Sequence, residues 1–169
     1  KLKYKRFDTS SIRYITQAGG KLDSDVVRYF VNECGQLGQE FFVMYGQTEA
    51  SPRISYADEK DLMKYPDTVG RVIPGGKIFI KNKKKIGEIL YKGNNIFRGY
   101  ASKRADLTYL KKINILRTGD IGLMKKDMLF ITGRLSRFIK LHGVRINLDI
   151  LEKYLNDLNI NCKCIYTNN

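Results

Sequence analysis

Hydrophobic positions near the start of the chain form two short strand-like segments separated by one stretch with helical spacing. The segments 11–16 (Ser-Ile-Arg-Tyr-Ile-Thr) and 41–44 (Phe-Phe-Val-Met) have the length and composition of strands. Between them, residues 23–35 begin with Asp-Ser-Asp, continue with apolar residues three and four apart and end at a glycine, which predicts an amphipathic helix. A strand, a helix and a strand in this order predict a crossover between parallel strands, and therefore an α/β fold.

The period of the apolar positions changes to two in the middle of the chain. Alternating segments that predict antiparallel strands are 77–80, 87–91 and 122–131. Polar residues at 82–85 and at 126–127 predict two hairpin turns, and one helix is predicted at 58–65. The economical fold for residues 68–134 is a small antiparallel β-barrel or curled sheet that follows the crossover.

The C-terminal residues predict the start of a further small α+β unit. Segments 137–140 and 144–146 have the composition of two strands, joined by a turn at 142–143. Residues 148–158 carry four leucines at helical spacing on one face, which predicts a helix. Residues 160–167 are predicted to begin another strand.

The composition is that of a globular protein. With 169 residues, 43% apolar and 11% aromatic, the chain is long enough for one domain plus part of another. No apolar run approaches the roughly 18 residues needed to cross a bilayer, and the basic residues 1–6 lead into no hydrophobic segment, so neither a membrane span nor a signal peptide is expected. Cytoplasmic localisation follows by default. The three cysteines are an odd number without framework spacing, which suits reduced thiols.

A formal net charge of +14 is the best argument in the composition for nucleic-acid binding. Lysines are nevertheless spread along the whole chain, and their densest cluster, at residues 81–85, lies between two predicted strands without interleaved aromatic residues. This distribution favours a lysine-rich surface, and no specific nucleic acid is expected as a partner. Cys162 and Cys164 with His142 also offer metal-ligand chemistry, but both cysteines lie in an apolar run, which favours packed thiols.

The stretch 43–51 concentrates chemistry at the end of a predicted strand. Tyr45 and Gly46 leave the apolar run and turn, and Thr48 and Glu49 follow directly. Ligands of α/β sheets bind beyond the carboxyl ends of the strands, and an aromatic face, a hydroxyl and a carboxylate suit a purine, a phosphate and Mg²⁺. Taken alone, the stretch fits a solvated loop after a strand equally well.

Two further stretches, 116–120 (Leu-Arg-Thr-Gly-Asp) and 133–146 (Gly-Arg-Leu-Ser-Arg-Phe-Ile-Lys-Leu-His-Gly-Val-Arg-Ile), give this loop a context. In the order Tyr-Gly-x-Thr-Glu, Thr-Gly-Asp and Gly-Arg-x-x-x-x-Ile-Lys-x-x-Gly-x-Arg-Ile, the three stretches resemble the signatures of the adenylate-forming superfamily. That superfamily includes acyl-CoA synthetases, the adenylation domains of peptide synthetases, and luciferases. The resemblance extends over most of the chain. Residues 93–100 also resemble the superfamily's Gly-x-x-x-x-x-Gly-Tyr segment, to which we assign no contact.

The resemblance implies a binding site for ATP or AMP. Gly19, Gly20 and Lys21, at the exit of the first predicted strand, would lie along the adenine. Tyr45, which precedes Gly46, would stack on it. Independently of the resemblance, two glycines at a strand exit let the backbone approach a flat ligand closely, although they also fit a plain turn before a helix.

The resemblance also assigns residues to the phosphates, the ribose and Mg²⁺. Thr48 would hydrogen-bond a phosphate and Glu49 would hold Mg²⁺, and these two are the catalytic candidates. Asp120, at the end of a predicted short strand, would bind the ribose, because a carboxylate can accept hydrogen bonds from two vicinal hydroxyls. Arg134 would bridge ribose and phosphate. Without the flanking motifs, a surface salt bridge between Asp120 and Arg134 explains that pair equally well.

The activity that the resemblance implies is that of an AMP-forming ligase. A small carboxylic acid and ATP would form an acyl-adenylate, and the acyl group would then pass to CoA or to the phosphopantetheine of a carrier protein. Residues 1–67 would be the C-terminal part of the α/β nucleotide-binding subdomain, 68–135 a β-barrel-like subdomain, and 136–169 the start of a mobile C-terminal domain. Ser136 takes the hinge position, where the superfamily usually has Asp and sometimes Lys.

The sequence lacks two parts of the superfamily's machinery, a Ser/Thr/Gly-rich phosphate loop and a lysine near the end of the small domain. The chain is therefore expected to be a fragment of such a ligase and to be inactive alone. Two alternatives are a non-catalytic homologue that binds nucleotide and a basic nucleic-acid-binding module.

Overall fold

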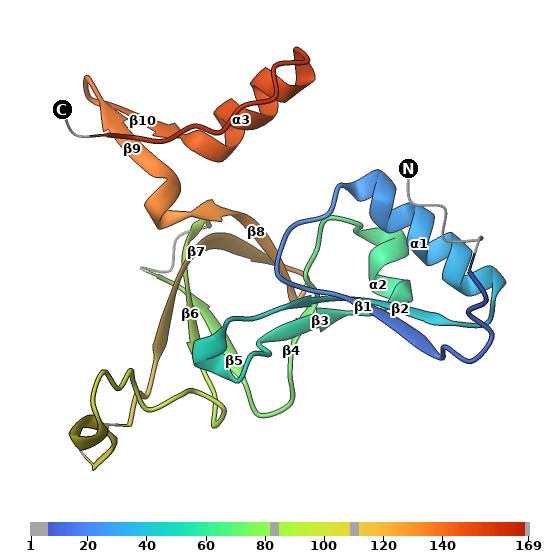
Figure 1. Cartoon of the computed structure of the whole chain (residues 1–169), viewed down its shortest axis with the longest axis horizontal. Coiled ribbons are helices and arrows are strands. Elements are labelled where there is room, and N and C mark those ends of the chain that lie inside the picture. The colour runs from blue at the N-terminus through green and yellow to red at the C-terminus, as the bar shows by residue number, and fades with distance from the viewer. Residues whose placement is uncertain (1–6, 82–84, 109–111, 168–169) are drawn as a thin grey trace.

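The computed structural model describes residues 7–81, 85–108 and 112–167, which form three sheets (Figure 1). The predicted turn at 82–85 lies for the most part outside the described residues. The first two sheets share an apolar core, and the third, smaller sheet lies beyond the end of the second together with one helix. In the described parts of the chain, no helix combines the length and the apolar composition needed to cross a membrane.

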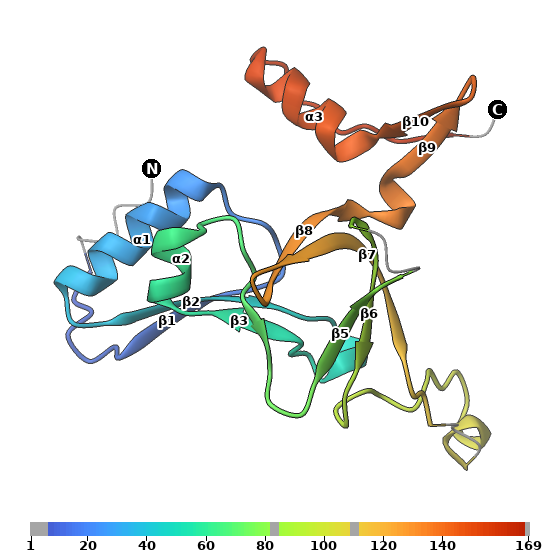
Figure 2. The ribbon, with the colours of Figure 1, turned by 180° about the vertical axis from the view of Figure 1, so that it is seen from behind.

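The first sheet contains the N-terminal strands. They are β1 (Tyr14–Gln17), β2 (Glu40–Tyr45), β3 (Ser55–Ala57) and β4 (Arg71–Val72), in that order. β1 and β2 are parallel, with helix α1 (Ser24–Gln36) between them in the chain, whereas β3 and β4 continue the sheet in antiparallel pairing. Helix α1 and the shorter helix α2 (Glu59–Lys64) lie on the same face of this sheet in both views (Figure 1, Figure 2).

Helix α1 lies on that face because its apolar side chains form a core with the sheet. Val27, Val31 and Cys34 are buried against Phe41 and Val43, which are inward-facing residues of β2. The remaining positions of α1 are mostly polar and exposed, as an amphipathic helix requires. The predicted helix is thereby confirmed to within one residue at each end.

The second sheet is antiparallel. Its strands are β5 (Lys77–Ile80), β6 (Gly87–Lys92), β7 (Leu116–Lys125) and β8 (Met128–Arg134), in chain order. β7 and β8 turn at Lys126 and Asp127, whose φ values of 50° and 62° suit the twist of a tight hairpin. The sheet curls like half of a barrel, in agreement with the curled sheet predicted for this part of the chain (Figure 1).

A second apolar core joins the two large sheets. Ile89, Tyr91 and Leu129 of the second sheet are inaccessible to solvent, and they belong to one cluster with Tyr45 and Ile54 of the first. The end of β2, where the candidate chemistry begins, is therefore fixed against the second sheet by packing.

Backbone hydrogen bonds reinforce this junction around Thr68, which is 1% exposed. The Leu129 carbonyl accepts from the Val69 amide at 2.9 Å and from the Thr68 hydroxyl at 2.8 Å. The Gly70 amide donates to Thr68 Oγ1 at 3.1 Å. A Cβ atom on Gly70 would lie 1.8 Å from the Tyr56 carbonyl oxygen, so this tight crossing requires glycine.

Replacing Thr68 by valine is expected to lower the free energy of unfolding by about 1–3 kcal/mol, because the buried Gly70 amide loses its acceptor. Urea unfolding followed by circular dichroism measures the change. Thr167→Val, at an exposed position near the C-terminus, is the matched control and should change little. Equal stability of the two variants would show that the hydroxyl does not stabilise the junction.

The third unit contains β9 (Phe138–Leu141), β10 (Val144–Asn147) and helix α3 (Leu148–Asp157), as predicted. His142 and Gly143 form the turn between the strands, both with positive φ, 47° and 86°. Asn147 caps the helix, because its side-chain oxygen accepts from the Asp149 amide at 2.9 Å.

Arg137 connects the parts of this third unit. Its side chain is 19% exposed, and its guanidinium donates to Asp149 Oδ1 at 2.7 Å, to the Cys164 carbonyl at 2.8 Å and to Glu152. The short 3-10 turn η5 (Leu135–Arg137) joins the unit to β8. The unit is therefore fastened together by one side chain immediately after the predicted hinge.

Two predictions about strands are wrong. Asp120 lies inside β7 and not at the end of a short strand, because β7 continues past Gly119, which has a φ of +73°, and through a shift in register after Ile121. Residues 160–167, all of which the structure describes, form no strand. The Cys164 amide and carbonyl bond instead to side chains of the third unit, so at this residue they do not join a sheet.

Candidate functional site

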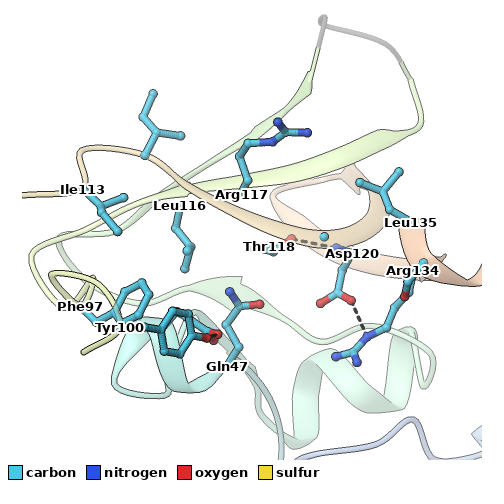
Figure 3. A pocket seen from close by; sticks show the side chains of 14 residues that line it. Gln47, Phe97, Tyr100, Ile113, Leu116, Arg117, Thr118, Asp120, Arg134 and Leu135 are labelled. Carbon is cyan, nitrogen blue, oxygen red and sulfur yellow. Dashed lines mark hydrogen bonds and ion pairs between the residues drawn. The ribbon is translucent and has the colours of Figure 1, made fainter. Parts of the chain in front are cut away.

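Asp120 is the centre of a polar cluster at the junction of the two large sheets. The Tyr45 hydroxyl, at the end of β2, donates to Asp120 Oδ2 at 2.7 Å, and Arg134 Nε donates to Oδ1 at 2.8 Å. The side chain of Asp120 is 4% exposed, whereas that of Arg134 is 66% exposed. A buried carboxylate therefore binds one neutral donor and one guanidinium that reaches solvent. Figure 3 shows the guanidinium of Arg134 beside Asp120.

Strand pairing and a threonine hold this cluster in place. Asp120 and Arg134 are direct partners across β7 and β8. Thr118 Oγ1 accepts from the Asp120 amide at 3.1 Å and donates to the Ile89 carbonyl of β6 at 2.8 Å. Burial raises the pKa of the Tyr45 hydroxyl, and the charge of Asp120 raises it further. Tyr45 therefore stays protonated and remains a hydrogen-bond donor.

A cavity of about 690 Å³ borders Asp120 and Arg134 (Figure 3). Glu49 and Ser136 also line it, so the residues expected to bind Mg²⁺ and to act as the hinge border the same space. Its apolar and aromatic lining residues are Phe97, Tyr100, Ile113, Ile115, Leu116 and Leu135. Thr48, the expected phosphate ligand, is exposed and is not among the residues that line this cavity.

A second cavity, of about 550 Å³, borders the same Asp120 and Arg134 pair. The residues expected at the adenine that line it are Gly19, Gly20, Lys21, Tyr45 and Gly46. A Cβ atom on Gly19 or Gly20 would have no neighbour within 4 Å, and Gly19 has a φ of +89°. The backbone at both glycines is therefore open toward the cavity, which suits a flat ligand.

Glu49 has a partner that sequence reasoning missed. The Tyr100 hydroxyl donates to Glu49 Oε1, and this hydrogen bond lowers the pKa of the Glu49 carboxyl below its ordinary value. Glu49 is therefore ionised at neutral pH, as a cation ligand must be. The only signal in the sequence was the resemblance of residues 93–100 to a Gly-Tyr segment, which by itself predicts no contact with Glu49.

A second charged pair at the first cavity was also missed. Arg117 lines the cavity and donates to both oxygens of Glu88, at 3.1 Å through Nε and 2.8 Å through Nη2. The side chain of Glu88 is 4% exposed, and Arg117 lowers the pKa of its carboxyl. The two residues meet across an irregular register between β6 and β7, which spacing in the sequence does not encode.

The carboxylate oxygens at the first cavity suit a divalent cation whose other ligands are the phosphates of a bound nucleotide. Mg²⁺ is usually held by one or two carboxylates together with substrate phosphates. Of the two carboxylates at this cavity, Asp120 already accepts a hydrogen bond on each oxygen, which leaves Glu49 as the candidate cation ligand. Among the described residues, no three or more His, Cys, Asp or Glu side chains cluster into a metal site, and the three cysteines are free. The donor set therefore fits a nucleotide-bound ion better than an all-protein metal cage.

Comparisons with known proteins point to one class of enzyme. The family model described as AMP-binding enzyme matches residues 1–101. The chain belongs to this family, and thus to the adenylate-forming superfamily.

Individual relatives are ligases and synthetases. "Putative acyl-CoA synthetase YngI" of Bacillus subtilis is 28% identical over 160 residues, which cover 88% of this chain and 29% of that protein. A D-alanine–D-alanyl carrier protein ligase of Bacillus licheniformis is 35% identical over 130 residues, which cover 68% of this chain and 26% of the ligase.

A solved structure of a synthetase is also similar to this chain. O-succinylbenzoate coenzyme A synthetase (MenE) from Bacillus subtilis, in complex with ATP and magnesium ion, has a TM-score of 0.67 and 25% sequence identity. The match covers 88% of this chain and 32% of that one. The chain thus spans about a quarter to a third of the length of the proteins it resembles. The mixed α/β architecture with a curled sheet is that of adenylate-forming enzymes.

Proposed function

We propose that this chain is the nucleotide-binding part of an ATP-dependent ligase that activates a carboxylic acid as its acyl-adenylate and then transfers the acyl group to a thiol. The observation that carries the proposal is the Asp120 carboxylate, buried between Tyr45 and Arg134 at the border of two cavities. Membership of the AMP-binding family supports the same chemistry. The thiol would belong to CoA or to the phosphopantetheine of a carrier protein.

Asp120 would bind the ribose of ATP or AMP. A carboxylate offers about four positions for hydrogen bonds, and Tyr45 and Arg134 occupy two of them. The two that remain suit the vicinal hydroxyls of ribose. Arg134 would reach ribose and phosphate together, because its planar guanidinium has several donors and is largely exposed.

The adenine would occupy the second cavity, along residues 19–21 and against Tyr45. Glu49 would bind Mg²⁺ at the first cavity, and Thr48 would hydrogen-bond a phosphate from its exposed position. When bound, the ion neutralises negative charge on the phosphates. The chain's own residues bind and orient the nucleotide, which matters because attack on the α-phosphate depends mostly on positioning and on neutralising charge.

The organisation of the chain is part of the proposal. Residues 1–67 and 68–135 would be two subdomains of the nucleotide-binding region, and 136–169 would begin a C-terminal domain that turns about Ser136. The first two parts are in close contact, since β4, at residues 71–72, pairs with β3. A cytoplasmic setting is proposed as well, and the free cysteines are consistent with it.

Calorimetric titration of the 169-residue chain with AMP tests the proposal. Binding should persist when the salt concentration rises to the physiological range, because adenine and ribose recognition does not depend on release of counterions. Failure of the wild-type chain to bind AMP or ATP would contradict the proposed function.

The net charge of +14 favours one competing function, that of a nucleic-acid-binding module. Because the lysines are dispersed, we expect oligonucleotides to bind only weakly, with a dissociation constant above the micromolar range at physiological salt. Any affinity should fall steeply as salt increases, in contrast to that for AMP. Fluorescence anisotropy with labelled single-stranded and duplex DNA and RNA measures this. Sub-micromolar binding at physiological salt would favour the nucleic-acid function instead.

A further inference from the structure

A loop that follows β6 is fastened to the turn that carries Glu49. The side-chain amide of Asn95 donates to the Ala50 carbonyl at 2.5 Å and to the Arg53 carbonyl at 2.8 Å. The Tyr91 hydroxyl donates to Asn95 Oδ1 at 2.7 Å. Because the amide group has partners on both its nitrogen and its oxygen, the Asn95 side chain has one orientation that satisfies them all. This side chain therefore fixes the backbone at the end of the turn, at Ala50, and three residues beyond it, at Arg53.

Backbone contacts add to this attachment. The Ser51 hydroxyl donates to the Asn95 carbonyl at 2.9 Å, and the Phe97 amide donates to the Glu49 carbonyl at 2.9 Å. Ala50, next to Glu49, is completely buried. The main chain of Glu49 is thus held in a position from which its side chain lines the first cavity.

Tyr100 connects the same loop to the side-chain carboxylate of Glu49. Its hydroxyl donates to Glu49 Oε1, and its ring meets the edge of Phe97 at 4.9 Å between centroids and 78° between planes. In Figure 3 the two rings lie side by side at the cavity, near Gln47. Phe97 packs in turn against the core shared by the two large sheets. Although Tyr100 is 74% exposed, its ring is held by its contact with Phe97, and its hydroxyl reaches Glu49 from that position.

We propose that Tyr100 is a positioning residue that orients the Glu49 carboxylate toward the divalent cation of a bound nucleotide. This inference rests on the proposed function. One hydrogen bond on Oε1 leaves the other acceptor positions of the carboxylate open to a cation. Groups that hold a metal ligand in its binding orientation reduce the side-chain entropy lost on binding, and their removal typically weakens metal affinity by about 10–100-fold.

The test separates binding of the cation from binding of the nucleotide. Mn²⁺, observed by electron paramagnetic resonance, serves as the cation probe for the 169-residue chain in the presence of ATP. Tyr100→Phe keeps the ring contact with Phe97 and removes only the hydroxyl, and it is expected to weaken Mn²⁺ binding about tenfold. Its affinity for ATP in EDTA should stay within about twofold of wild type. Tyr154→Phe, at an exposed tyrosine of α3 that lines neither cavity, should change neither quantity.

A double-mutant cycle shows whether Tyr100 acts through Glu49. Glu49→Gln should weaken Mn²⁺ binding, and adding Tyr100→Phe to it should have little further effect, because the two changes interrupt one interaction. Unchanged Mn²⁺ affinity in Tyr100→Phe, or full additivity of the two substitutions, would overturn the inference while leaving the nucleotide site intact. If the wild-type chain bound no ATP in EDTA, the proposed function would fail, and this inference with it.

Discussion

No acid-dependent exchange of pyrophosphate into ATP is expected from the 169-residue chain alone, across a panel of fatty, aryl and amino acids. Adenylation requires that the triphosphate be held at one end and the carboxylate oriented at the other, an advantage worth about 7–11 kcal/mol. The sequence contains neither the Ser/Thr/Gly-rich phosphate loop nor the small-domain lysine. Loss of only ~4 kcal/mol lowers the rate about a thousandfold, which places exchange by the chain at background.

A full-length D-alanine–D-alanyl carrier protein ligase with its own amino acid provides the positive control for this assay. Acid-dependent exchange by the 169-residue chain would mean that the catalytic residues are wrongly assigned. If a longer protein that contains this chain also remained silent while it bound AMP, the non-catalytic homologue would become the better explanation.

Replacing Asp120 by alanine is expected to weaken AMP binding at least tenfold. The substitution removes both acceptors proposed for the ribose hydroxyls, and hydrogen bonds to a charged group contribute about 1.5–3 kcal/mol each. It also leaves the buried Tyr45 hydroxyl without its acceptor, which should cost about 1–3 kcal/mol of folding stability. Calorimetry with AMP measures the affinity, and urea unfolding measures the stability.

Asp120→Asn is the matched variant for packing. Its amide oxygen can still accept from Tyr45, while its nitrogen faces Arg134, whose exposed guanidinium can be solvated by water. We therefore expect stability closer to wild type than in the alanine variant, with AMP affinity still reduced, because one acceptor oxygen and the negative charge are lost. Unchanged AMP affinity in both variants would rule out Asp120 as the ribose ligand.

Local pattern was sufficient to predict the elements whose stability depends mainly on their own residues. Helix α1 has Val27 and Val31 on one face and polar residues on the other, so its existence and bounds follow from its periodicity. The β7 and β8 hairpin is marked by the polar pair Lys126 and Asp127 between two apolar runs. In these cases the residues that decide the structure are neighbours in the chain.

The candidate site could be predicted only through its resemblance to a family. Tyr45 and Asp120 are 75 residues apart, and no rule of spacing predicts that they share a hydrogen bond. Matching both to motifs of one superfamily placed them at one nucleotide, and the structure brings them into contact. The roles assigned to them stay predictions until a nucleotide is titrated.

The contacts of Glu49 and Glu88 could not be predicted because they depend on how distant strands and loops meet. Arg117 reaches Glu88 across the irregular register between β6 and β7, and Tyr100 reaches Glu49 from a loop 51 residues further along the chain. The error at residues 160–167 has a similar origin. The segment is apolar enough for a strand, but at Cys164 the side chains of Arg137 and Glu152 take up the backbone groups.

The Arg137 network limits how the C-terminal residues can turn. The ladder of β8 ends at Arg134, and from Arg137 onward helix α3 and the segment around Cys164 are tied to a single guanidinium. Only Leu135 and Ser136 lie between β8 and the Arg137 contacts, so the proposed rotation about Ser136 would be confined to the backbone dihedrals of about two residues. The C-terminal unit would then rotate as a rigid body, so that a small change in the backbone dihedrals at Ser136 would displace the far end of α3 by a larger distance. Ser136 also lines the first cavity, so the axis of the proposed rotation would pass beside a ligand bound there.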